Sequence, residues 1–376
     1  GTLAFTTGDD DKLPLAGGTM TGNIVLGTNT VGGLQITTTA TSNIGLGANA
    51  VDSITTGDWN VGLGDNALTA TTSGERNVGV GFNALLLNTT GVRNSAVGMD
   101  ALGANTSGGY NTALGNNSLG ANTTASNNTA VGYNSLLANT TGATNTAVGF
   151  EAAKTSTTAE NVAAFGYRAA QDNTASNITA IGTNALMENT SGANNAALGH
   201  NSLKTNTTGS ANTALGRQAL KANTSANHNT AGGFESMLSN TTASNNTAFG
   251  SESLRANTTG DGNVSVGYTA LTANTTGTDN TAIGKESLQA NTTASNNTAV
   301  GRQAMFYNTT GSQNVAVGLN ALKANTTGAN NTAIGYIALT ANTTGAQNVA
   351  VGDKAGDSVT TAEKNTFVGR NAGATV

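Results

Sequence analysis

Small apolar and polar residues follow one another in a fixed order along most of the chain. A glycine recurs every 17 residues from position 47 to position 166 and again from 182 to 369, which makes twenty glycines with a single 16-residue interval. We call these residues corner glycines and number the other positions from them, so that relative to Gly132, Asn128 is at position −4 and Tyr133 at +1. A pattern that stays in phase over this distance predicts an ordered repeat array.

Most positions of the repeat accept one kind of residue. Position −4 is Asn in 18 of 20 repeats, position −2 is Gly, Ala or Ser everywhere except at Phe367, and position −1 is Val, Leu, Ile or Phe everywhere except at Gly232. Position +3 is always Ala or Ser, position +4 is usually Leu, and position +7 is usually Asn followed by Thr. The idealised unit reads N-T-A-V-G-x-x-A-L-x-A-N-T-T-G-x-x.

The unit predicts one coil of a β-solenoid. The N-T-A-V segment favours a short strand, with Thr and Val facing one way and Ala the other. The corner glycine suits a bend that needs positive φ or close backbone approach, and N-T-T-G is typical of a turn. We therefore expect an all-β protein, a parallel β-solenoid (β-roll or β-helix) of about twenty 17-residue coils, in which a single helical turn at the Ala-Leu segment is also compatible with the pattern.

The core of such a coil is thin, since each repeat supplies about one strand aliphatic residue and one Leu. The invariably small position −2 predicts that another backbone comes close there. That backbone is either the opposite wall of the same coil or a second chain at a rotation axis. We expect an elongated parallel homotrimer, because a coil this thin gains most by burying a second face.

Two regions follow from the phase of the repeat. Residues 1–42 form an N-terminal leader or connector that contains the segment LPLAGGTMTG, and residues 43–376 form the 17-residue repeat array. The 16-residue interval before Gly182 predicts a local irregularity in an otherwise uniform stack.

Composition and charge exclude several classes of protein. The 376 residues include 53 Asn, 66 Thr and 50 Gly, with 9% charged and 4% aromatic residues, too few large side chains for a bulky globular core. The absence of Cys excludes disulfides, thiol nucleophiles and thiolate metal sites. A net charge of −5 with only 15 Lys and Arg argues against nucleic-acid binding. The sequence contains no run of 18 apolar residues, the length needed to span a membrane as a helix.

Two stretches resemble known families. The strand motif Asn-Thr-Ala-Val-Gly, as in residues 128–132, resembles the head repeats of trimeric autotransporter adhesins, which are left-handed parallel β-rolls assembled as trimers. The segment from Leu13 to Gly22 is similar to one found in bacteriophage tail fibres ahead of a shaft or repeat region. The unit from Gly132 to Gly142 is similar to arrays in phage tail fibre and tail spike proteins, where a self-cleaving C-terminal intramolecular chaperone often follows.

The leader segment favours the phage family, and this resemblance implies a structural tail fibre segment that positions or forms a host-receptor-binding surface. The implied partners are further copies of the chain, a host cell-surface polysaccharide or protein receptor, and other tail or fibre proteins through the N-terminus. The implied location is the virion tail, outside the cell. The alternative is the head of a bacterial trimeric surface adhesin. A third hypothesis is an ice-binding solenoid, although the two turn Thr residues are adjacent and would face opposite ways in a strand.

Candidate receptor contacts lie at position +1, which varies most among otherwise strict positions. An aromatic row there could stack on sugar rings, which makes Tyr133, Tyr167, Tyr268 and Tyr336 the predicted contacts. The alternative is that these rings cover neighbouring coils or adjacent chains. Trp59, the only Trp, is predicted to cap the start of the array.

No catalytic constellation can be assembled from the sequence. The G-x-G patterns, as at Gly62 and Gly64, belong to the repeat frame and lack the strand–helix context of a phosphate-binding loop. The acidic run at residues 9–11 is typical of a solvated loop, and His200 and His228 fall at different positions of the repeat. The sequence therefore predicts a protein that is not an enzyme and has no cofactor or metal.

Overall fold

A computed structural model of the chain describes residues 42–373. This part contains twenty short strands, one for each corner glycine, and each strand ends directly before its glycine. The strands are β1 (Ile44–Leu46), β2 (Val61–Leu63), β3 (Val78–Val80), β4 (Ser95–Val97), β5 (Thr112–Leu114), β6 (Thr129–Val131), β7 (Thr146–Val148), β8 (Val162–Phe165), β9 (Ile178–Ile181), β10 (Ala196–Leu198), β11 (Thr213–Leu215), β12 (Thr230–Gly232), β13 (Thr247–Phe249), β14 (Val264–Val266), β15 (Thr281–Ile283), β16 (Thr298–Val300), β17 (Val315–Val317), β18 (Thr332–Ile334), β19 (Val349–Val351) and β20 (Thr366–Val368).

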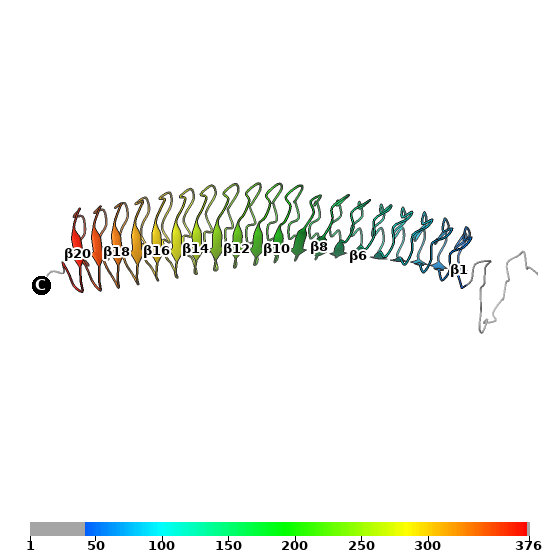
Figure 1. Cartoon of the computed structure of the whole chain (residues 1–376), viewed down its shortest axis with the longest axis horizontal. Coiled ribbons are helices and arrows are strands. Elements are labelled where there is room, and N and C mark those ends of the chain that lie inside the picture. Colours follow the sequence, from blue (N-terminus) through cyan, green and yellow to red (C-terminus); the bar gives the residue numbers. More distant parts are fainter. Residues whose placement is uncertain (1–41, 374–376) are drawn as a thin grey trace, which may run out of the picture. The chain divides into compact units, whose positions relative to one another are not determined.

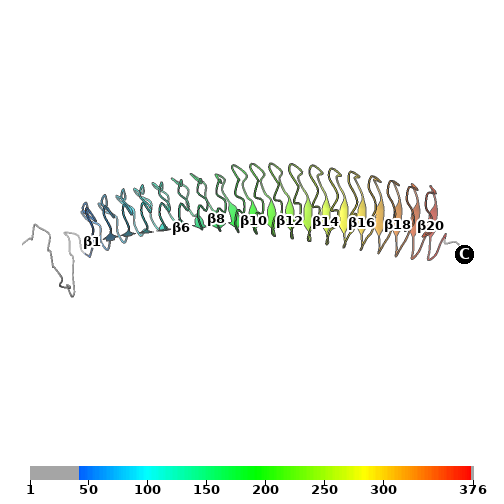
Figure 2. The same ribbon diagram turned by 180° about the vertical axis from the view of Figure 1, so that it is seen from behind.

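Each strand pairs in parallel with the next strand in the sequence, as Thr298 of β16 does with Val315 of β17. The twenty strands thus form one continuous sheet along a stack of coils, seen from its two sides in Figure 1 and Figure 2. The predicted all-β parallel solenoid is confirmed. Residues 42–373 contain no helix, and the Ala-Leu segment, where a helical turn was compatible with the pattern, is a turn instead.

Four residues with positive φ bend each coil. In the coil of Gly132 these are the corner glycine itself (φ 126°), Asn134 (56°), Leu136 (48°) and Thr144 (60°). A Leu in the left-handed region costs roughly 1–2 kcal/mol in backbone energy. Burial offsets that cost: Leu136 is fully buried, and burying a Leu side chain contributes about 1.5–3 kcal/mol.

The core lies inside the single coil. Position −2 (Ala130), position +3 (Ser135) and position +4 (Leu136) have no exposed surface, so the small position −2 faces the opposite wall of its own coil. The expectation that the strand aliphatic at −1 joins the core is wrong. Because successive side chains alternate between the two sides of a strand, burying the Ala at −2 turns the residues at −3 and −1 outward, and Leu215 is 52% exposed.

Two ladders of buried asparagines run along the interior. At position −4, the Asn297 side chain accepts the backbone N–H of Asn314 in the next coil (3.0 Å) and donates to the carbonyl of Gly311 (2.9 Å). At position +7, Asn308 donates both to the Oδ1 of Asn291 in the preceding coil (3.0 Å) and to the same Gly311 carbonyl (2.9 Å). Where a coil has Asn at both positions, the carbonyl at position +10 can thus use both lone pairs and join the two ladders.

The ladders satisfy backbone groups that a narrow coil would otherwise leave buried without partners. Where a ladder stops, an acceptor is left over. Ser156 replaces Asn at +7, and the Oδ1 of Asn139 in the preceding coil has no hydrogen-bond partner; the same holds for Asn342, whose successor at +7 is Val359.

The predicted irregularity before Gly182 is confirmed. Strands β8 and β9 are four residues long instead of three, because Val162 and Ile178 replace Asn at −4 and pair with each other in the sheet. Both are buried in the apolar core, and the preceding coils carry Ala153 and Ala170 at +4 in place of Leu. Apolar volume lost at one position is regained at another, so the stack continues through the shorter coil.

Phe367 closes the last described coil by a similar exchange. It occupies the otherwise small position −2, and glycines stand at +4 both in the preceding coil (Gly356) and in its own coil (Gly373). A Cβ on Gly356 would lie 2.9 Å from the ring. The ring thus takes the space that a Leu fills elsewhere.

The corner glycines are predicted to be irreplaceable, whereas a glycine at position +5, such as Gly103, is not. Gly250 has φ 131°, and a Cβ there would lie 2.6 Å from the carbonyl carbon of Gly267 in the next coil. We expect Gly250→Ala to lower the melting temperature clearly, and Gly103→Ala, the control at position +5, to change it little. Gly103 does not have positive φ, a Cβ there would come no closer than 3.3 Å to a neighbouring atom, and other coils carry larger residues such as Leu86 at +5. Equal effects in a thermal unfolding experiment would contradict the role given to the corner.

Breaking one ladder should destabilise the stack locally. Asn297→Ala leaves the buried N–H of Asn314 without its acceptor, which should lower the free energy of unfolding by about 2 kcal/mol. Thr310→Ala is the control, because that side chain is exposed. Urea unfolding and amide hydrogen exchange of the neighbouring coils measure both, and an Asn297 variant as stable as the control would contradict the importance of the ladder.

Candidate functional site

The position +1 row lies on the surface, directly after the corner glycines. All four predicted contacts are exposed by about half: Tyr133 (47%), Tyr167 (45%), Tyr268 (52%) and Tyr336 (49%). They belong to four different coils, and the structure brings only the first two into one cluster.

That cluster is a stack of three rings. Phe150 lies between Tyr133 and Tyr167, with centroid separations of 5.5 Å and 5.3 Å and interplanar angles of 17° and 9°. The rings therefore turn their faces toward one another along the stack and present mainly their edges to solvent. This arrangement favours the alternative in which the rings cover neighbouring coils. Receptor contact by Tyr133 and Tyr167 stays a prediction, for which the edges and hydroxyls are the accessible groups.

A charged cluster supports one end of the stack. The Arg168 guanidinium lies 5.1 Å from the centroid of the Tyr167 ring and pairs with the Glu151 carboxylate at 3.2 Å. Lys154 binds the other oxygen of Glu151, Oε1, at 2.8 Å, and Gln171 donates at 3.0 Å to Oε2, the oxygen that pairs with Arg168. The hydrogen bond from Lys154, with the charges of Lys154 and Arg168, holds the pKa of the Glu151 carboxyl below its usual 4.5, against the opposing effect of burial.

Tyr268 and Tyr336 lie apart from this cluster and from each other. Eight coils separate Tyr268 from Tyr133, which corresponds to roughly 38 Å at the usual strand spacing. The ammonium of Lys285 lies 5.7 Å from the Tyr268 ring centroid. The four tyrosines thus do not form one pocket, and any contact they make would be spread along the stack.

A second exposed row consists of the position −1 residues, which the sequence had predicted to lie in the core. The position −1 residues of nearly all strands form an outward apolar row along the sheet, with Ile181, Ile283 and Ile334 each 40% exposed. Alternation along the strand was the available signal, but it does not tell which of the two faces is inside. Contiguous exposed apolar surface of this kind marks interaction sites.

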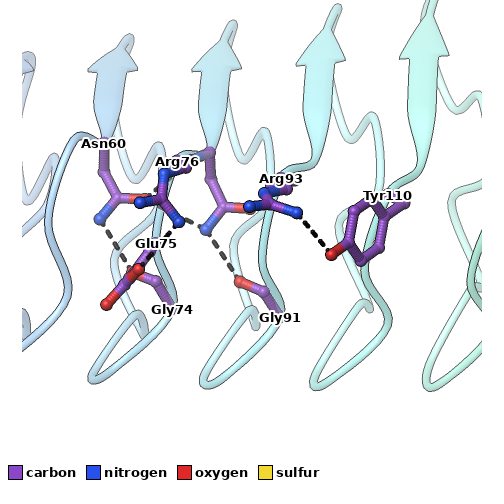
Figure 3. A network of polar contacts seen from close by, with 8 residues as sticks. Asn60, Gly74, Glu75, Arg76, Gly91, Arg93 and Tyr110 are labelled. Carbon is purple, nitrogen blue, oxygen red and sulfur yellow. Dashed lines mark hydrogen bonds and ion pairs between the residues drawn. The ribbon is translucent and has the colours of Figure 1, made fainter.

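A third group of exposed residues, at position −5, was not predicted from the sequence. Trp59, Arg76, Arg93 and Tyr110 occupy position −5 in four successive coils near β2 to β5, and all four are exposed. Figure 3 shows three of them beside the asparagine ladder, with Arg76 reaching Glu75 and Arg93 reaching Tyr110. The spacing of 17 between these residues was the signal that could have found the group. Trp59, predicted as a cap, belongs to it.

The other residues considered as site candidates in the sequence are not brought together into a binding site by the described structure. His200 lies at +1 and His228 at −5, and residues 42–373 hold no group of three His, Cys, Asp or Glu side chains placed to bind a metal. The acidic run at residues 9–11 lies outside the described residues. Gly62 and Gly64 are the inner wall and the corner of one coil. Within the same 42–373 span, no helix is long and apolar enough to cross a bilayer.

The turn threonines face different ways, as their adjacency predicts. At position +8, the Thr326 hydroxyl donates to the carbonyl of Thr343 in the next coil (3.0 Å), while Thr327 at +9 is exposed. The turn thus presents a single row of free hydroxyls rather than a two-dimensional array, which does not favour an ice-binding surface at the turn.

No protein-family model, curated protein or solved structure matches the chain. The candidate surfaces are therefore argued from the geometry of this chain.

The Glu151 cluster should make stability depend on pH. Its lowered pKa means that the carboxylate stabilises the fold above pH 4.5 and that this contribution is lost as the pH falls through the lowered value. We expect Glu151→Gln to be less stable than the native chain at pH 7 and the difference to shrink at pH 3. Glu160→Gln, at an exposed carboxylate, is the control. A Glu151 deficit in urea unfolding that is equal at both pH values would contradict the ion-pair account.

Proposed function

We propose that the chain is a structural segment of a phage tail fibre, in which a rigid β-solenoid positions or forms a host-receptor-binding surface. The observation that carries the proposal is the unbroken parallel sheet of twenty coils, tied by backbone hydrogen bonds and internal asparagines. Such a stack is long and thin and has no bulky domain or enclosed site within residues 42–373. The resemblance of the Leu13–Gly22 segment to tail fibres supplies the assignment to a phage.

The proposed fibre is a parallel homotrimer that packs through its sheet face. The small position −2, which first suggested a close contact between chains, is used inside each coil. The apolar position −1 row supports the trimer instead, because it offers each chain a continuous exposed face that the single coil leaves unburied. Three parallel copies would also repeat every surface feature three times, so that weak receptor contacts add through effective concentration.

The alternative is the head region of a bacterial trimeric surface adhesin. The strand motif Asn-Thr-Ala-Val-Gly forms the sheet here, and it is the motif that resembles adhesin heads. The same stack and the same exposed rows would serve either protein, with a different attachment.

The mass of the native particle tests the assembly. We expect light scattering on a size-exclusion column to give close to three times 37.0 kDa. Ile283→Asp, which places a charge in the position −1 row, should lower that mass, whereas Thr276→Asp, at an exposed turn position of the preceding coil, should not.

Two outcomes would contradict the trimer as proposed. A single-chain mass would remove it, and a trimer insensitive to Ile283→Asp would place the contact elsewhere. Once a trimer is established, fluorescently labelled chain is expected to bind bacterial cells of a susceptible strain. A trimer that binds no strain in a broad panel would contradict receptor binding and leave only the role of a spacer.

A further inference from the structure

Position −5 carries two arginines between two aromatic residues in four successive coils. Trp59, Arg76, Arg93 and Tyr110 have φ of 57°, 57°, 56° and 60°. This left-handed conformation suits Asn, whose short polar side chain bonds locally, and Asn is the commonest residue at −5 in the coils that follow. Bulky residues there cost backbone energy that the coil does not require. Other large residues, such as His228 and Gln313, occur at −5 singly, whereas these four follow one another along the stack.

Their side chains form one row in the order aromatic, cation, cation, aromatic. The Arg76 Cζ atom lies 4.5 Å from the Trp59 ring centroid, and the Arg93 Cζ atom lies 5.2 Å from that of Tyr110. Arg93 also donates from Nη1 to the Tyr110 hydroxyl at 2.6 Å, as Figure 3 shows. The rings hold both guanidinium groups in place while leaving them at the surface.

The two guanidinium groups are not equally neutralised. Arg76 pairs with Glu75 at 3.3 Å, whereas Arg93 forms no ion pair within the described part of the chain. The adjacent position −6 is acidic beside Trp59 and Arg76 but holds the uncharged Val92 beside Arg93. Arg76 and Arg93 stand one coil apart, roughly 4.8 Å. Like charges placed across neighbouring strands repel, so an anion between them would be favoured.

We propose that this row binds the acidic groups of a polysaccharide that lies along the stack, with Arg93 as the main anion-binding residue. A guanidinium group binds carboxylate, sulfate or phosphate oxygens in bidentate geometry. Trp59 and Tyr110, each about half exposed, flank the cations and offer rigid apolar surface to sugar rings. The choice of a polysaccharide rests on the proposed function, whereas the anion site rests on the four side chains.

The test measures binding of the intact chain to immobilised polygalacturonate, dextran sulfate and neutral dextran by biolayer interferometry. We expect salt-sensitive binding to at least one acidic polymer and none to dextran. The two acidic polymers distinguish carboxylate from sulfate as the preferred group. Arg93→Gln should weaken that binding about tenfold. The matched control is Arg217→Gln, because Arg217 lies 5.4 Å over Phe234 at another exposed row.

Several outcomes would overturn the proposal: no binding to either acidic polymer, equal binding to dextran, or equal losses in the Arg93 and Arg217 variants. Circular dichroism and native mass establish that both variants fold and assemble like the native chain. A native chain that forms trimers and binds bacterial cells but binds no acidic polymer would overturn this inference alone. The proposed fibre function would stand in that case.

Discussion

The two asparagine ladders are the interaction on which the rest of the structure depends. A 17-residue coil is too narrow to pack large side chains against each other, so its wall-to-wall contacts must include backbone groups. Those groups are buried and need partners. The Asn297 and Asn308 side chains meet at one carbonyl, that of Gly311, and each also reaches an adjacent coil. The same bonds therefore close the coil across its width and join it to its neighbours.

A ladder of this kind forces every coil to resemble the next. Each buried side chain has its own equivalent as its nearest partner above and below, so a change in one coil is felt in the adjacent ones. Ser156 illustrates this, because it leaves the Oδ1 atom of Asn139 in the preceding coil without a hydrogen-bond partner. Larger departures occur in compensating sets, as with Val162 and Ile178 beside Ala153 and Ala170. The surface is free of this constraint, and departures from the repeat at exposed positions are therefore the informative ones for function.

The sequence predicted the class of fold and the coil boundaries, because periodicity follows directly from stacking. It also predicted the disturbance before Gly182. It did not predict which strand face is buried: Val131 is larger and more apolar than Ala130, and burial normally follows size. Here the close approach of the opposite wall decides, and Ala130 is inside. Nor did the sequence show that Asn128 is internal, since Asn is ordinarily a surface or turn residue. Only the position of a second backbone at hydrogen-bond distance makes its burial favourable.

The aromatic residues show how the array distinguishes packing from recognition. Three rings follow one another at position +1 and stack face to face, in the order Tyr133, Phe150 and Tyr167. Such a row stabilises adjacent coils and needs no ligand to account for it. At −5, the rings of Trp59 and Tyr110 are instead covered by cations of the coils between them, and one of those cations lacks a carboxylate partner in the described structure. Stacked rings satisfy one another's contacts, whereas a row that contains a cation without an ion-pair partner leaves that charge uncompensated. The position −5 row is therefore the surface on which a ligand has most to contribute.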